Sequence, residues 1–122
     1  MAAFLLDEHM RGKLAAAIRK HNAAGDGVFL DIRVVGEESE LPLGTLDPEL
    51  IRWAEKEGRL LLTFDKSTMP GHLADHLAAG AHTPGILCVR RRLSIPGLII
   101  ELEIVAHAGR PEDFADTITY IP

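Results

Sequence analysis

The chain has 122 residues, of which 47% are hydrophobic and 25% are charged, and its formal net charge is −5. This composition excludes disordered, collagen-like and coiled-coil chains, and the length favours a single domain, residues 1–122. The apolar runs fall far short of the roughly 20 residues that cross a membrane, and the opening residues lack a basic leader and a cleavage site. We therefore expect a soluble, cytoplasmic protein with no membrane partner. Its acidity disfavours a nonspecific nucleic-acid coat protein but leaves open an enzyme whose metal ions bridge carboxylates to phosphates.

Strand and helix patterns alternate along the chain. In chain order, the apolar periodicity predicts a strand over 3–6, a helix over 10–21, a strand over 28–35, a surface loop over 36–46, a helix over 47–57, a strand over 60–64, a helix over 72–79, a strand over 86–89, a helix over 94–108 and a strand over 117–121. Right-handed crossovers join strands that alternate with helices. The pattern therefore predicts a three-layer α/β/α fold with a mainly parallel sheet of about five strands.

Two positions within these elements carry more specific expectations. Asp47-Pro48-Glu49 predicts a strong helix start, with Asp47 as the N-cap residue. The single cysteine, Cys88, lies in an apolar strand and is expected to be an inert buried thiol.

The helix predicted over 94–108 has an apolar stripe that packs either on the sheet or on a second subunit. The residues of this stripe are Leu98, Ile99, Leu102 and Val105.

Aspartates mark one edge of the predicted sheet. Asp7 and Asp65 each follow a buried strand, and Asp47 begins a helix at the same edge. Ligands of open α/β sheets bind outside the carboxyl ends of the strands. Converging carboxylates repel one another unless a cation neutralises them, and hard ions such as Mg²⁺ or Mn²⁺ prefer oxygen ligands. The three aspartates therefore predict metal-dependent phosphoryl chemistry.

Each of these acids also has a local structural interpretation. A cap alone explains Asp47, a turn after the strand explains Asp65, and Asp7 or Glu8 is a suitable cap for the helix that follows. Both interpretations stay open from the sequence.

Three segments resemble a known family. Residues 5–9 (LLDEH), 44–51 (GTLDPELI) and 57–66 (EGRLLLTFDK) look like the compact PIN-like domains of unknown function, which are similar to toxins of bacterial toxin–antitoxin pairs. The resemblance implies a PIN-type fold and a ribonuclease that depends on Mg²⁺ or Mn²⁺, with Asp7, Asp47 and Asp65 at the acidic positions. It further implies RNA products with a 5′ phosphate and a 3′ hydroxyl, and an antitoxin protein as partner. A homodimer is the form expected if the apolar stripe of the helix over 94–108 packs on a second subunit.

The resemblance extends to a fourth acid and also has departures. Residues 40–44 (ELPLG) resemble the segment that carries a further carboxylate in such domains, which makes Glu40 a candidate. Phe64 stands where an arginine is common, and Lys66-Ser67 replace a second acid and an aromatic residue. An inactive binding module that keeps the fold is therefore the main alternative.

An RNA substrate needs positive charge near the acidic edge. Arg90, Arg91 and Arg92 follow the strand over 86–89, and Lys66 adjoins Asp65. We expect these side chains to face phosphates, although a solvated loop explains the arginines equally well.

Two further functions compete with the nuclease. His72 and His76 share one helix face and, with His82, would supply zinc ligands, but the glutamate of the metalloprotease motif is absent. The Asp7-Glu8 pair and residues 68–71 after Asp65 resemble a phospho-acceptor receiver domain. Such a domain needs its acceptor on the third of five strands and a lysine after the last, and residues 119–122 (TYIP) contain none.

Overall fold

The computed structural model describes residues 1–121. Its elements in chain order are β1 (Ala3–Leu6), a 3-10 turn η1 (Glu8–Met10), α1 (Lys13–Ala24), β2 (Asp31–Val34), α2 (Asp47–Glu57), β3 (Leu60–Thr63), α3 (Met69–Ala78), β4 (Ile86–Val89), α4 (Ile95–Ala108), α5 (Pro111–Phe114) and β5 (Ile118–Ile121). The five strands form one sheet in the order β2-β1-β3-β4-β5, and every pair is parallel. None of the helices between residues 1 and 121 combines the length and apolar character needed to cross a membrane.

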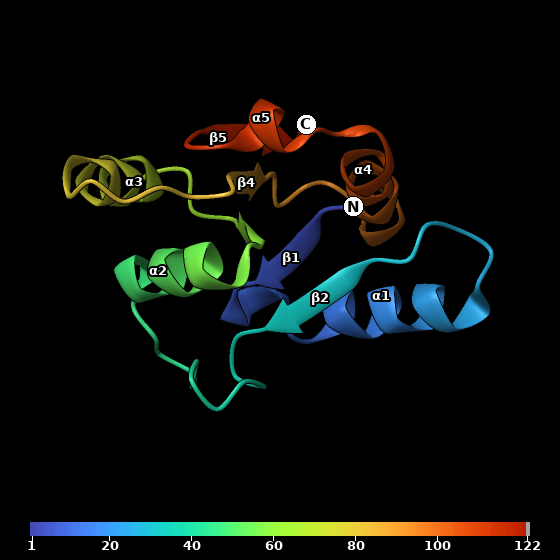
Figure 1. Ribbon diagram of the computed structural model, residues 1–122. Coiled ribbons are helices and arrows are strands. Elements are labelled where there is room, and N and C mark those ends of the chain that lie inside the picture. The colour runs from blue at the N-terminus through green and yellow to red at the C-terminus, as the bar shows by residue number, and fades with distance from the viewer. Residues whose placement is uncertain (122) are drawn as a thin grey trace.

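Helices cover both faces of the sheet, with α1 and α4 on one side and α2 and α3 on the other (Figure 1). Alternate residues of each strand point to opposite faces. Phe4 and Leu6 pack in the core under α1 and α4, whereas Leu5 packs in the core under α2 and α3. The central strands β3 and β4 are buried throughout, as expected for parallel strands covered on both sides. The predicted three-layer α/β/α fold is confirmed.

Helix α4 packs on the sheet. Leu98 and Leu102 are buried in the core under α1 and α4, and Ile99 and Val105 are packed against it. Ser94 caps the helix by accepting a hydrogen bond from the Gly97 amide at 3.1 Å. Of the two interpretations of this apolar stripe, the structure shows packing on the sheet within one chain.

The strand predicted over 28–35 is shorter in the structure, because side chains satisfy the backbone of its first residues. The Leu30 amide and carbonyl both bond to the Asn22 side chain, at 2.9 and 2.8 Å, and the Val28 amide donates to Glu103 at 2.9 Å. These bonds replace the ladder bonds of a strand. The hydrophobic pattern alone does not show such partners.

The segment before β5 is fixed by Asp116, whose backbone φ is 61°. Its carboxylate accepts a hydrogen bond from the Thr83 amide at 2.8 Å and lies 2.9 Å from His82 Nδ1. The Asp116 amide in turn donates to the Thr83 carbonyl at 2.9 Å. Aspartate tolerates the left-handed conformation better than most residues. The pKa of Asp116 is lowered, first by the Thr83 amide and then by His82.

We expect the variant Asp116→Asn to be less stable than the wild type at pH 7. Asparagine accepts from the Thr83 amide and tolerates the same backbone, but it removes the negative charge beside His82. A lowered carboxyl pKa contributes stability above the unfolded pKa, and this contribution is lost as the pH falls through the folded pKa. In urea unfolding series the difference should therefore begin to shrink at about pH 4, the unfolded pKa, and should vanish only below the lowered folded pKa. A difference that persists unchanged at pH 3 would assign the effect to geometry instead of charge.

Candidate active site at the carboxyl ends of the strands

The three predicted aspartates line one cleft of about 470 Å³, here called the acidic cleft. Asp7 follows β1, Asp65 follows the neighbouring strand β3, and Asp47 lies in the first turn of α2. The chain passes from β1 to β2 on one side and later adds β3 on the other, so this is the switch point of the sheet. The remaining lining residues are Glu8, His9, Thr45, Leu50, Thr63, Phe64, Lys66, Ser67 and Arg91.

Asp7 is the most deeply placed of these acids, with 7% of its surface exposed. One carboxylate oxygen accepts a hydrogen bond from the His9 amide at 3.0 Å, which caps η1. Burial raises the pKa of Asp7, against the opposing effects of the His9 amide and the His9 side chain. The fold therefore holds a carboxylate at a site where its charge is poorly solvated, and such a group is suited to bind a cation.

Asp47 is not the N-cap of α2, contrary to the prediction. Leu46 occupies the cap position, no side chain caps the helix, and Asp47 is its first residue. The Asp47 carboxylate instead lies 3.8 Å from His72 Nε2. Burial raises its pKa, as do the charges of Asp65 and Glu8, while His72 lowers it. Because capping does not use this carboxylate, its charge is available to a ligand in the cleft.

The carboxylate of Asp65 is occupied by its own loop. One oxygen accepts hydrogen bonds from the amides of Ser67 and Thr68, both at 2.9 Å, and the other accepts from the Thr68 hydroxyl. The bonds from Thr68 and Ser67 lower the pKa of Asp65. The structure thus shows the turn role that the sequence left open for Asp65. It sets the path from β3 to α3.

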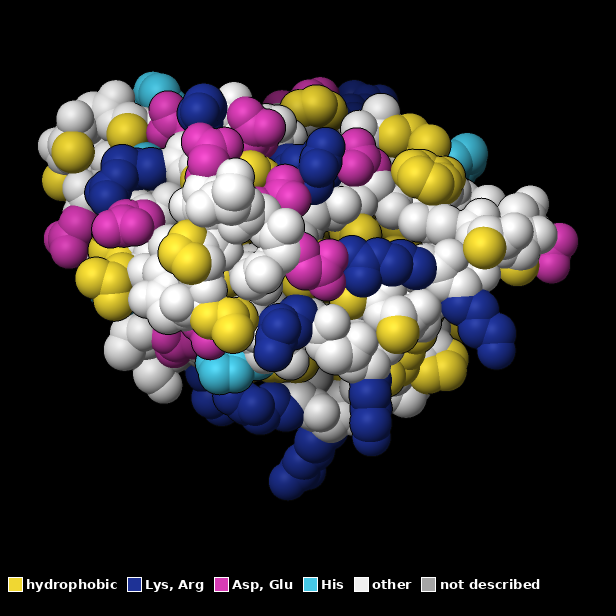
Figure 2. Space-filling model, turned by 90° about the horizontal axis from the view of Figure 1, so that it is seen from below, with side chains coloured by type: hydrophobic (Ala, Val, Ile, Leu, Met, Phe, Trp, Pro, Cys, Tyr) yellow, Lys and Arg dark blue, Asp and Glu magenta, His cyan; other side chains and the backbone are white. Residues whose placement is uncertain are grey.

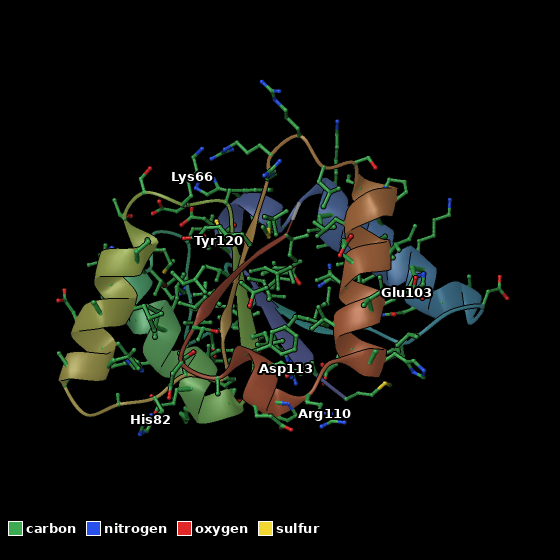
Figure 3. The ribbon with its side chains drawn as sticks, turned by 90° about the horizontal axis from the view of Figure 1, so that it is seen from above. Lys66, His82, Glu103, Arg110, Asp113 and Tyr120 are labelled. Carbon is green, nitrogen blue, oxygen red and sulfur yellow. The ribbon has the colours of Figure 1, made fainter. Side chains whose placement is uncertain are left out.

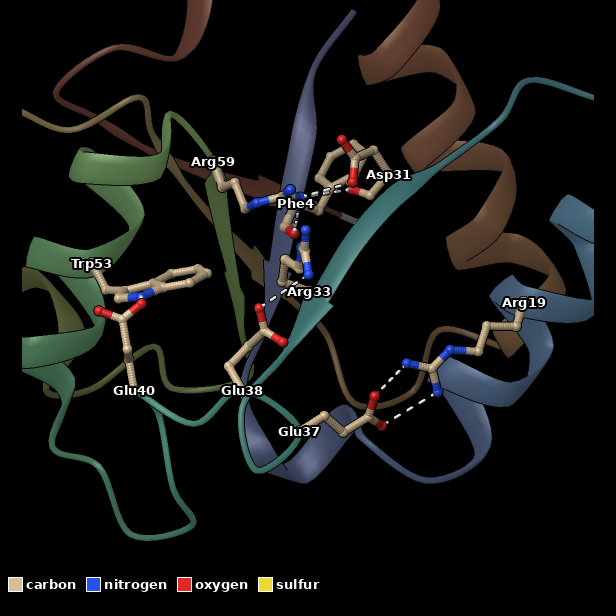
Figure 4. A network of polar contacts seen from close by, with 9 residues as sticks. All are labelled: Phe4, Arg19, Asp31, Arg33, Glu37, Glu38, Glu40, Trp53 and Arg59. Carbon is tan, nitrogen blue, oxygen red and sulfur yellow. Dashed lines mark hydrogen bonds and ion pairs between the residues drawn. The ribbon is translucent and has the colours of Figure 1, made fainter.

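The structure does not bring Glu40 to the acidic cleft. Its carboxylate lies 3.4 Å from Trp53 Nε1 on α2 (Figure 4). It also lies 3.5 Å from Lys56 Nζ on the same helix. The resemblance placed a fourth acid on the 36–46 loop, but the acid that joins the cleft is Glu8, which follows Asp7 directly. Glu8 accepts a hydrogen bond from the Gly44 amide at 3.1 Å and so connects η1 to that loop.

The donor chemistry of the cleft fits a hard divalent ion that keeps much of its water. Within residues 1–121, no three His, Cys, Asp or Glu side chains are grouped closely enough to hold one metal ion together. Mg²⁺ commonly takes only one or two protein carboxylates, together with waters and substrate phosphates. Asp7 and Asp47 are the suitable pair, since the carboxylate of Asp65 already accepts three hydrogen bonds.

The predicted basic residues lie beside these acids. Arg91 and Lys66 line the acidic cleft itself, and Arg90 and Arg92 line the groove next to it. Several long Lys and Arg side chains project from one margin of the molecule in Figure 2. Positive charge near the carboxylates is what a phosphate-containing substrate requires.

The histidines do not assemble as the zinc interpretation requires. His72 faces Asp47, whereas His76 Nε2 lies 2.7 Å from Glu55 and 2.7 Å from the His82 carbonyl. His82 faces Asp116. These histidines belong to polar contacts between elements. Cys88 is a free buried thiol whose pKa is raised by burial, as expected for an inert cysteine.

The sequence did not single out several polar side chains of the cleft, among them Thr63 and His9. Thr63 is buried at the end of β3 and bonds to the Asp65 amide at 3.0 Å, and His9 reaches the cleft through η1. The feature of the sequence that could have indicated them is that each lies within two residues of Asp65 or Asp7.

No family model, no curated protein and no solved structure matches the chain. The function is therefore inferred from the cleft itself.

Proposed function

We propose that the protein is a divalent-metal-dependent ribonuclease of the PIN-like type. The observation that supports it is the acidic cleft, which Asp7, Asp47 and Asp65 from three separate segments line together with Arg91. Carboxylates next to an arginine are suited to a metal ion and a phosphate at the same point. The role of a toxin held by an antitoxin is part of this proposal through the resemblance alone.

Each side chain has a defined task in this proposal. Asp7 and Asp47 hold the ion, which when bound supplies a Lewis acid for the phosphate and lowers the pKa of a water. Arg91 and Lys66 contact the phosphate oxygens and orient the backbone of the substrate. Asp65 fixes the loop that carries Lys66, through its bonds to Ser67 and Thr68.

We expect Asp47→Asn to reduce RNA cleavage with Mn²⁺ by about 100-fold or more, because even groups behind a metal ligand affect binding or activity by about 10- to 100-fold. Glu40→Gln is the matched control, because it neutralises an acid outside the acidic cleft and should cleave at the wild-type rate. Calorimetric titration with Mn²⁺ and cleavage of a fluorescent single-stranded RNA are measured on the same three proteins.

The outcomes separate the alternatives. Loss of both Mn²⁺ binding and cleavage in Asp47→Asn alone supports the nuclease. A folded wild type that neither binds Mn²⁺ nor cleaves RNA would support the inactive binding module instead. Equal losses in Asp47→Asn and Glu40→Gln would place the active acids elsewhere.

One observation favours a second candidate, the phospho-acceptor domain. Asp65 follows β3, the third strand of five, and the sheet order is shared with receiver-type doubly wound domains. Against it, both Asp65 oxygens accept hydrogen bonds from Ser67 and Thr68, and an acceptor needs a free oxygen. Incubation with acetyl phosphate tests this candidate, since a mass increase of one phosphoryl group that Asp65→Asn abolishes would favour it over the nuclease.

A further inference from the structure

A second depression, here called the basic groove, adjoins the acidic cleft. It has a volume of about 590 Å³ and lies where β3, β4 and β5 end. The two depressions share Phe64, Lys66 and Arg91, so a ligand that occupies one extends directly into the other. In Figure 3, Lys66 and Tyr120 lie toward one end of the sheet, away from His82, Asp113 and Arg110.

The cations of the basic groove have no acidic partners among the described residues. Lys66, Arg90, Arg91 and Arg92 line it, and none of them takes part in the ion pairs found within residues 1–121. Several Lys and Arg side chains elsewhere in the described chain are also absent from these ion pairs, so what distinguishes the basic groove is that it brings four such cations to one place. A protein of net charge −5 thus gathers four cations without a salt-bridge partner at one place, and two of them, Lys66 and Arg91, also line the acidic cleft. This arrangement suits a polyanion with several phosphates.

Two aromatic side chains stand among these cations. Tyr120 is on β5, opposite Cys88 in the sheet, and 58% of its surface is exposed. The Arg91 guanidinium lies 5.0 Å from the centroid of the partly buried Phe64 ring. Open tyrosine rings and guanidinium planes are the surfaces on which unpaired bases stack. The groove thus combines phosphate contacts with stacking surfaces.

We propose that the basic groove is a subsite for single-stranded RNA, in which one base stacks on Tyr120 while Arg90 and Arg92 contact the backbone. The proposal deepens the proposed function, and it rests on that function only for the cut in the adjoining acidic cleft. A base in a duplex is stacked and paired, so its face is not free for Tyr120. The subsite therefore selects unpaired RNA and positions the nucleotide next to the cleaved one.

Binding is measured by fluorescence anisotropy with a labelled 12-nucleotide RNA in EDTA, which prevents metal-dependent cleavage. Tyr120→Ala should weaken binding about 10- to 100-fold, the usual effect of losing one stacked base, and Tyr120→Phe should restore it. Phe29→Ala is the matched control, because Phe29 is 61% exposed but does not line the groove. The same RNA in a duplex should bind more weakly than the single strand.

A scan of abasic RNAs separates stacking from a fold defect in the edge strand. One abasic position should weaken binding to the wild type, and that position should have no effect on Tyr120→Ala. Replacing both Arg90 and Arg92 by Gln should lower the slope of log Kd against log salt by about 0.7 for each lost phosphate contact, whereas Tyr120→Ala should leave this slope unchanged.

Different results overturn the two proposals. If the wild type cleaves RNA with Mn²⁺ but Tyr120→Ala binds like Phe29→Ala, the subsite is wrong and the nuclease stands. If one abasic position weakens binding to the wild type but not to Tyr120→Ala, and no divalent ion produces cleavage, the subsite stands and the nuclease is wrong. Equal affinity for duplex and single strand would overturn the stacking model directly.

Discussion

Asp7→Asn is expected to melt about 3–5 °C above the wild type at pH 7 and to cleave RNA at least about 100-fold more slowly. The gain in stability corresponds to about 1 kcal/mol, a usual value when a residue that serves function is replaced by one that suits the fold. Asp7 is almost fully buried and its pKa is raised by that burial. Asparagine is uncharged and retains an oxygen for the His9 amide.

The stability gain of Asp7→Asn depends on the pKa of the Asp7 carboxyl in the folded and in the unfolded state. When a carboxyl pKa is higher in the folded state, ionisation disfavours folding, and this cost grows as the pH rises through the unfolded pKa. The advantage of Asp7→Asn is therefore present at neutral pH and disappears below about pH 4, where both states are protonated. Thermal unfolding at pH 7 and at pH 3.5 measures it.

Asp7→Ala separates the charge from the hydrogen bond. Alanine also removes the charge, but it leaves the His9 amide of η1 without its partner. We expect it to be less stable than Asp7→Asn by about 1 kcal/mol, the typical value of a cap. If Asp7→Asn melts below the wild type at pH 7, burial of the charge does not dominate at this position, and the functional interpretation of Asp7 loses its main physical support.

The fold was largely predictable because its signals are local and repeated. Buried strands such as 60–64 and 86–89 are short apolar runs, and helices such as 94–108 have apolar residues three and four apart. The helices predicted over 10–21 and 72–79 are displaced by about three residues at their starts, and α5 was not predicted. A different error occurs where distant side chains determine the backbone, as at residues 28–30, which bond to Asn22 and Glu103. No pattern within the segment itself indicates these partners.

The site was predictable in outline for a topological reason. Asp7 and Asp65 converge because the ends of neighbouring parallel strands must lie together, and the sequence shows which residues follow the strands. The loop over 36–46 has no such constraint, which explains why Glu40 was placed at the cleft but lies against Trp53 instead. The N-cap of α2 is Leu46, one residue before the predicted Asp47, and propensity rules do not locate a helix end to within one residue.

The second large effect is expected at Arg59, where Arg59→Ala should lower the free energy of unfolding by about 2–4 kcal/mol. Arg59 is 8% exposed and its Nη1 donates to the Phe4 carbonyl at 3.3 Å and to the Asp31 carboxylate at 3.0 Å (Figure 4). Because the Asp31 side chain is half exposed, the ion pair itself contributes little. The effect comes from the cavity that the long buried stem leaves between β1, β2 and β3.

Arg59→Met distinguishes volume from charge at the same position. The Nε of Arg59 is buried and has no hydrogen-bond partner within the described chain, so part of its solvation is lost without replacement. Methionine fills the space of the stem and removes that unsatisfied group, and the Asp31 carboxylate remains solvated without its partner because its side chain is half exposed. Urea unfolding should therefore place Arg59→Met within about 1 kcal/mol of the wild type. If Met and Ala destabilise equally, the hydrogen bonds to Phe4 and Asp31 hold the strands together, and filling the volume does not compensate for their loss.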